Sequence, residues 1–144
     1  MKDQEKISIT FRIKEIELLE TELKTPAQQL PENALFHFEI NIEHRVNVEL
    51  NLIIVFCTVN ILNESKGNQL GMIKVACVFV IENIQEFIDP ETKAINLQLP
   101  FLTSLNSITI STVRGVMFST FKGTFLNNAI LPILDPTQLV PSIP

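Results

Sequence analysis

The chain has 144 residues, the usual size of one domain, and a formal charge of −5 from 11 basic and 16 acidic side chains. Hydrophobic residues make up 46% and charged residues 19%, which excludes a disordered chain and a basic nucleic-acid-binding protein. The longest apolar runs, such as Leu52–Cys57, are far shorter than the ~20 residues that cross a bilayer, so no membrane span is expected. Met1–Lys6 is mostly charged, which predicts no signal peptide and a cytoplasmic location.

The N-terminal part alternates with period two, which predicts a strand over Ile7–Leu19. Apolar residues hold the odd positions as far as Ile13 and the even positions from Ile16 onward. Such a change of phase predicts a bulge, because one extra residue turns every later side chain to the other face of the sheet. Thr25–Pro31 contains two prolines and is expected to be an extended loop.

The clearest alternation lies in Phe36–Leu50 and continues without Gly or Pro into Leu52–Leu62. Because one strand of that length is unusual, we place a tight connection near Glu43–Asn47. A polar segment, Asn63–Gln69, then precedes another β-branched run, Leu70–Ile84, which predicts a hairpin. One face of the second hairpin strand is entirely apolar and needs cover from a helix or another sheet.

From Leu97 to Phe121 the apolar spacing changes to three to five residues, which is typical of one face of a helix. Pro100 suits its first turn and Gly123 its end, and a break is expected at Asn106-Ser107. The tail after the helix is rich in proline, so no long helix is expected there.

Strands followed by a helix predict the α+β class, with a four-stranded antiparallel sheet covered on one face by a long C-terminal helix. The chain is expected to form a single domain over residues 1–144. Its cysteines, Cys57 and Cys77, lie inside apolar runs and are interpreted as buried thiols. The high apolar fraction also favours an oligomer or a partner that covers exposed apolar surface.

No constellation of catalytic groups is apparent, so the chain is not expected to be an enzyme. We assign the two histidines, His37 and His44, to the exposed polar face of one strand. Seven residues of extended chain hold them over ~20 Å apart, which is too far to share a metal ion. Neither a metal nor a cofactor is therefore predicted.

One acidic cluster is interpreted as a solvated face or as a docking patch for a basic partner. It comprises Glu15, Glu17, Glu20 and Glu22.

The order and spacing of several short segments carry a family resemblance. The first is Phe11–Ile16, followed by Thr25-Pro26 at the start of the predicted loop. The others are Val78–Ile81 in the last predicted strand, and Lys122–Phe125 with Leu131-Pro132 after the helix. In that order they resemble the first strand, the crossover loop, the last strand and the helix-terminating segment of SecB chaperones.

The resemblance implies a SecB-like fold and an ATP-independent holdase that binds unfolded or extended polypeptides in apolar grooves. It also implies a homotetramer, in which protomers join their sheets and dimers pair through their helices. The family's role in protein export implies docking on the translocase motor. Glu20 matches one acidic docking position, whereas Lys24 and Met72 stand where others would be acidic.

Two alternatives to the general holdase stay open. One is a SecB-like protein devoted to a single partner, such as an antitoxin, since the motor-docking positions are incomplete. The other is a carrier of a small apolar ligand on a curved sheet covered by a helix.

The resemblance and the apolar pattern together suggest the client groove, which comprises Leu30, Leu35, Phe36, Phe38, Ile40, Leu139 and Val140. Partner docking is assigned to Glu15, Glu17 and Glu20. The helix interface between dimers is assigned to Val113, Val116, Met117 and Phe121, for which packing on the sheet is the alternative.

Overall fold

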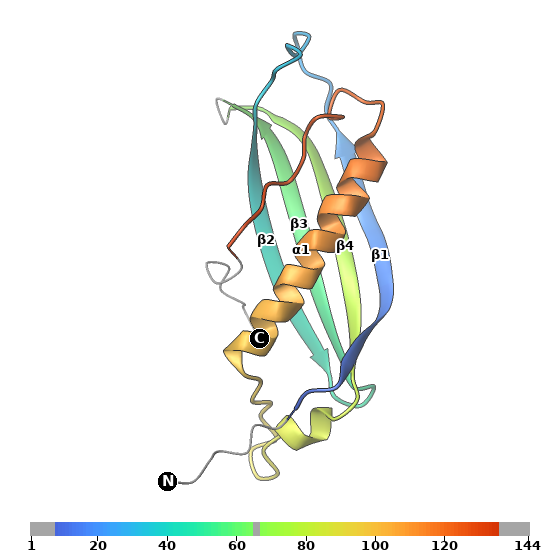
Figure 1. The fold of residues 1–144 in the computed structure, drawn as a ribbon, viewed down its shortest axis with the longest axis vertical. Coiled ribbons are helices and arrows are strands. Elements are labelled where there is room, and N and C mark those ends of the chain that lie inside the picture. Colours follow the sequence, from blue (N-terminus) through green and yellow to red (C-terminus); the bar gives the residue numbers. More distant parts are fainter. Residues whose placement is uncertain (1–7, 65–66, 136–144) are drawn as a thin grey trace.

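The structure, a computed structural model, describes residues 8–64 and 67–135. One antiparallel sheet carries one long helix diagonally across a single face (Figure 1). The predicted α+β class, with four antiparallel strands and a helix on one face, is confirmed. The elements follow in the order β1 (Phe11–Leu23), β2 (Phe36–Asn47), β3 (Leu52–Asn63), β4 (Gln69–Ile81), the short 3-10 helix η1 (Ile84–Phe87) and α1 (Leu99–Phe121).

The strands lie side by side in the order β1-β4-β3-β2, so the two N-terminal strands form opposite edges of the sheet. The chain passes from one edge to the other through residues 24–35, which we call the crossover loop (Figure 1). The predicted hairpin between β3 and β4 is confirmed. Asn63 helps to close it, because its side-chain oxygen accepts hydrogen bonds from the backbone N–H groups of Gly67 and Asn68 at 3.1 and 3.4 Å.

The predicted bulge in the first strand is confirmed, since the pairing of β1 with β4 shifts between Ile13 and Glu15. A second shift, between Leu18 and Glu20, was not predicted. The strand also runs on to Leu23, beyond the predicted end. Directly paired residues share a face, so the two shifts place the apolar residues Ile13, Ile16, Leu18 and Leu23 on the helix side of the sheet. The glutamates of β1 lie on the outer face.

The connection between β2 and β3 lies later than predicted. Pairing continues through Glu43, opposite Phe56, to Asn47, opposite Leu52, so the predicted connection near Glu43–Asn47 is wrong. The turn occupies residues 48–51. Its chemistry comes from two asparagines: Asn47 accepts a hydrogen bond from a backbone N–H of the turn, and Asn51 takes the left-handed backbone conformation with φ 58°.

The core fills the space between α1 and the sheet, where Phe79 of β4 is fully buried. α1 runs unbroken through Asn106, so the predicted break is wrong. Cys57 and Cys77 are both buried free thiols, as predicted, and burial raises the pKa of Cys57 to about 12. No helix in the described part of the chain is long and apolar enough to cross a membrane.

Candidate functional site

A groove lies between the crossover loop and the segment that follows α1. This segment, Gly123–Asp135, is called the strap. A hollow of about 220 Å³ is lined on the loop side by Leu30, Pro31 and Phe36, and on the strap side by Thr124, Phe125, Asn127 and Asn128. A second hollow, of about 390 Å³, shares Leu30, Pro31 and Ala34 with the first and adds Leu35. Its other side is formed not by the strap but by Asn63 and Glu64 at the end of β3. We call the two hollows together the groove.

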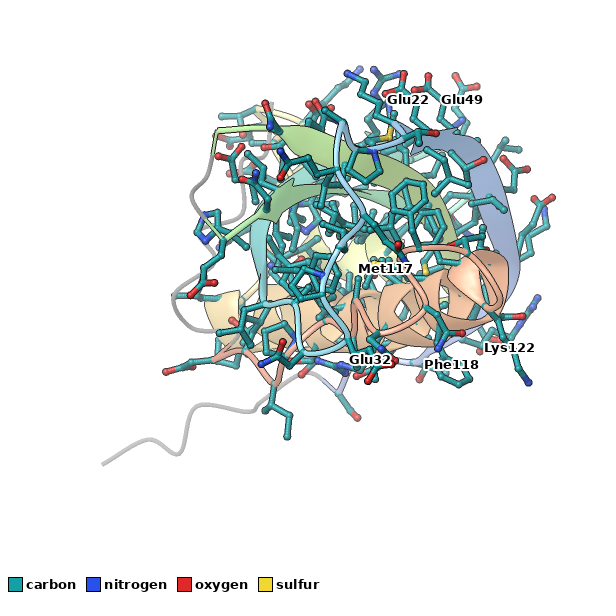
Figure 2. The ribbon with its side chains drawn as sticks, turned by 90° about the horizontal axis from the view of Figure 1, so that it is seen from above. Glu22, Glu32, Glu49, Met117, Phe118 and Lys122 are labelled. Atoms are coloured by element: carbon teal, nitrogen blue, oxygen red, sulfur yellow. The ribbon has the colours of Figure 1, made fainter. Side chains whose placement is uncertain are left out.

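The loop wall of the groove is bonded to the sheet at its start and closes a local turn near its end. Lys24 donates its backbone N–H to the carbonyl of Leu70 at 2.9 Å, and Ala34 donates to that of Pro31 at 3.0 Å. The prolines of the crossover loop have no backbone N–H to donate to a neighbouring strand, so the loop stays extended outside the sheet. It leaves Leu30 half-buried and Leu35 64% exposed. In Figure 2 the loop reaches from the sheet to the layer of α1, where its residue Glu32 lies.

The strap wall begins at Gly123, which takes the left-handed conformation with φ 81° and ends the helix, as predicted. The strap then folds back over the sheet and buries Leu126, Ala129 and Leu131 almost completely. Leu126 rests on Gly71 of β4, where an added Cβ would come within 2.5 Å of the leucine Cδ1. Because Gly71 has no side chain, the strap can pack closely against the sheet at this position.

Three of the seven predicted groove residues line this groove. Leu30 and Phe36 line the first hollow, and Leu35 lines the second. Phe38 and Ile40 follow along β2 and are half-buried against the core, and neither is among the residues that line the two hollows of the groove. The predicted Leu139 and Val140 lie outside the described residues.

The groove residues of the strap were not predicted from the sequence, and neither were four of the loop: Gln29, Pro31, Glu32 and Ala34. Phe125 lies two residues after Gly123, and that glycine predicted that the helix ends and the chain changes direction there. Nothing in the sequence marks Pro31 and Ala34 as groove residues. They line the hollow only because the loop runs past it, and the sequence does not reveal the course of the loop.

Three of the four residues assigned to a helix interface are instead core residues. Val113, Met117 and Phe121 are at most 2% exposed, and Val116 is half-buried. Figure 2 shows Met117 on the sheet side of α1 and Phe118 on the opposite side. Phe118 is 51% exposed and lies on the outward face that a partner helix would contact.

The predicted acidic cluster lies on the outer face of β1, away from the helix. Glu15, Glu17 and Glu20 are all exposed and pair with Val78, Ala76 and Lys74 of β4. A side-chain hydrogen bond with Glu15 and repulsion by its charge raise the pKa of Glu17. The structure thus brings the three predicted docking residues together along one edge of the outer face.

The centre of the outer face carries the opposite charge. Arg45 of β2 and Lys74 of β4 lie over the ring of Phe56, with their charged atoms 5.2 and 5.7 Å from its centre. These two cations cover apolar surface that the sheet would otherwise expose. These cations lie among carboxylates, because Glu43 pairs with Phe56 and Glu20 pairs with Lys74, so the outer face carries both charges rather than a uniformly acidic surface.

His44 is not exposed, which corrects its assignment to the polar face. It shares the helix side of β2 with Ile42 and is 1% exposed, because alternate residues of a strand share a face. Its Nε2–H donates a hydrogen bond to Oδ1 of the buried Asn106 on α1, at an Nε2–Oδ1 distance of 2.7 Å. Burial lowers the pKa of His44, while the bond to Asn106 opposes this shift.

An apolar edge remains open on the helix side of β1. Ile13, Ile16, Leu18 and Leu23 are 40–49% exposed, because α1 crosses the sheet diagonally and leaves part of this strand uncovered (Figure 1). Isolated exposed apolar residues are ordinary, but a row of them along an edge strand marks an interaction surface.

No protein-family model and no curated protein sequence matches this chain. Among solved structures, the chain is similar to the SecB-like chaperone Rv1957 of Mycobacterium tuberculosis, solved in complex with a ChAD peptide from the HigA1 antitoxin. The TM-score is 0.58 and the sequence identity 14%, over 86% of this chain and 90% of that chain. The likeness shows that this chain has a SecB-like fold.

Proposed function

We propose that this chain is an ATP-independent chaperone that holds unfolded or extended polypeptide segments in the groove between the crossover loop and the strap. The observation that carries the proposal is the groove itself, an open hollow that presents Leu30, Pro31, Phe36 and Phe125 among polar residues such as Glu32 and Asn127. Phenylalanine, leucine and proline side chains bury apolar segments without directional bonds, at roughly 25 cal/mol per Å². Such a surface accepts many sequences and needs no catalytic group and no cofactor.

A single dedicated partner is the second candidate. The solved SecB-like chaperone holds a peptide from an antitoxin, which favours a role for this chain with one polypeptide such as an antitoxin. The incomplete set of acidic motor-docking residues, with Lys24 and Met72, favours it over protein export. Affinity purification from cells distinguishes the two, since a general holdase retains many unrelated polypeptides and a dedicated binder retains one.

The functional unit is proposed to be a homo-oligomer in the cytoplasm, a tetramer built as a dimer of dimers. The exposed apolar row on β1 would be covered by a second copy, and the outward face of α1 around Phe118 would pair dimers. Glu15, Glu17 and Glu20 remain open on the outer face in this arrangement. They are proposed to dock a basic partner protein.

The proposal is tested by aggregation of lysozyme while its disulfides are reduced, followed by light scattering. Protein added in equal molar amount, without ATP, is expected to suppress the scattering. Unchanged scattering at several-fold excess would contradict the proposal. A retained small apolar molecule, detected by mass spectrometry of the purified protein, would favour a ligand carrier instead.

Leu35→Asp is expected to weaken binding of an unfolded client about tenfold or more without lowering protein stability, because it places a charge in the groove at a position that is already exposed. Binding is measured by fluorescence anisotropy of labelled, unfolded lysozyme. The matched control is Leu50→Asp, since Leu50 is 63% exposed, against 64% for Leu35, but lies in the turn between β2 and β3. Equal losses in the two variants would show that the groove is not the binding site.

A further inference from the structure

The strap has a second anchor, on α1 rather than on the sheet. The Nε of Arg114 donates a hydrogen bond to the carbonyl of Leu131 at 2.7 Å, and its Nη2 donates to the carbonyl of Pro132 at 2.7 Å. Both bonds are charge-assisted and run from one planar guanidinium to two consecutive carbonyls. Arginine has the rigid fork of donors that this geometry needs, whereas lysine is a point charge that can satisfy only one of the two well.

The Leu126 anchor lies within the groove wall, and the Arg114 anchor lies after it in the chain. The wall residues Thr124, Phe125, Asn127 and Asn128 lie between the end of α1 and the carbonyls that Arg114 holds. Leu126, in the middle of this stretch, is seated on Gly71. Local turns shape the wall itself, with Asn127 N–H donating to Thr124 O at 3.0 Å and Ala129 N–H to Leu126 O at 2.9 Å. At its start the strap is bonded to the end of α1 through Thr124, whose N–H and Oγ1 donate to the carbonyl of Phe121 at 3.0 and 2.7 Å. Arg114 supplies the bond to α1 at the other end of the strap.

We infer that Arg114 is a positioning residue of the groove: it holds the strap against α1 and so fixes the distance of Phe125 from the crossover loop. The inference rests on the proposed function, and it adds a residue that lines neither hollow of the groove. If the groove wall already has its bound conformation in the free protein, polypeptide binding does not have to order it. The entropy cost of ordering the wall then does not reduce the binding affinity. Without Arg114 only a fraction of the molecules has the wall in place, and the apparent dissociation constant rises by the inverse of that fraction.

The test compares Arg114→Gln and Arg114→Lys with wild type, using reduced and carbamidomethylated lysozyme as the probe. This probe stays unfolded and is basic, in contrast to the acidic chain. We expect its dissociation constant to rise about tenfold in Arg114→Gln and about threefold in Arg114→Lys, which keeps the charge but loses the fork. Arg12→Gln is the matched control, since Arg12 contacts Glu82 at 3.8 Å on the exposed surface and does not line the groove. Its expected dissociation constant is unchanged.

Hydrogen exchange of the free proteins separates positioning from general stability. In Arg114→Gln the strap amides of Asn127 and Ala129 are expected to exchange about tenfold faster, with the α1 amide of Val113 unchanged. Equal acceleration of all three amides would show a merely structural role and overturn the inference. Wild-type affinity in Arg114→Gln would overturn it too, and would leave the proposed function intact. Failure of wild type to bind the probe would overturn the proposed function itself, and the inference with it.

Discussion

Replacing Phe79 by alanine is expected to lower the free energy of unfolding by about 3–5 kcal/mol. Phe79 is fully buried in β4, beneath the helix, and its ring lies 6.4 Å from that of Phe11 on the neighbouring strand. The change removes the transfer energy of the ring and leaves a cavity between the sheet and α1, which the covered centre of the sheet cannot collapse to fill. Urea unfolding followed by circular dichroism measures the loss.

Phe79→Leu is the matched control for this prediction. It keeps most of the buried volume and is expected to cost less than about 1.5 kcal/mol. A cost below 1 kcal/mol for the alanine variant would contradict the placement of Phe79 at the centre of the core.

The second large effect on the free energy of unfolding is expected when only one member of the His44–Asn106 pair is replaced. Asn106→Leu removes the acceptor 2.7 Å from His44 Nε2 and leaves a buried N–H without a partner, which is expected to cost about 1–3 kcal/mol. His44→Leu costs a similar amount, because it leaves the Asn106 oxygen unpaired. The double variant is expected to recover most of the loss, since replacing both partners by apolar groups leaves nothing unsatisfied. A double-mutant cycle in urea measures this coupling, and strictly additive losses would contradict it.

The same pair gives a pH dependence with a defined sign. Burial lowers the pKa of folded His44 below its ordinary value of 6.5, so the unfolded chain takes up a proton at a higher pH than the folded one does. This contribution to stability is fully present above pH 6.5 and is lost as the pH falls below it, by up to about 1.4 kcal/mol per pH unit. The double variant lacks His44, so its stability relative to wild type is expected to rise as the pH falls from 7.5 to 5.5. A constant difference would contradict a buried, neutral His44.

Most of the fold could be predicted from segments in which apolar residues recur with a strict period. The change of phase between Ile13 and Ile16 located a real bulge, because the side chains of a strand can satisfy only one face at a time. The apolar parity of β2 likewise predicted its helix-facing side, and counting His44 within that parity would have predicted its burial. The turn after β2 was misplaced because alternation continues through Leu50, while Asn47 and Asn51 carry the turn chemistry.

The candidate site was predictable only where an apolar side chain lies in a loop or beside one. Leu30, Leu35 and Phe36 were found for this reason. Helical spacing alone could not tell which face of α1 meets the sheet, so Met117 was assigned outward although it is buried. The role of Arg114 had no sequence signal, because its partners are the carbonyls of Leu131 and Pro132, which any residue type would supply.

The central claim, that unfolded polypeptide binds in the groove, is tested most directly by methyl NMR of the protein with unfolded lysozyme added. The account predicts that methyl signals of Leu30, Ala34 and Leu35 shift or broaden with added polypeptide. Signals of Ile54 and Val80, on the outer face of the sheet, are expected to stay unchanged. Perturbation confined to the outer face, or none at saturating polypeptide, would contradict the account.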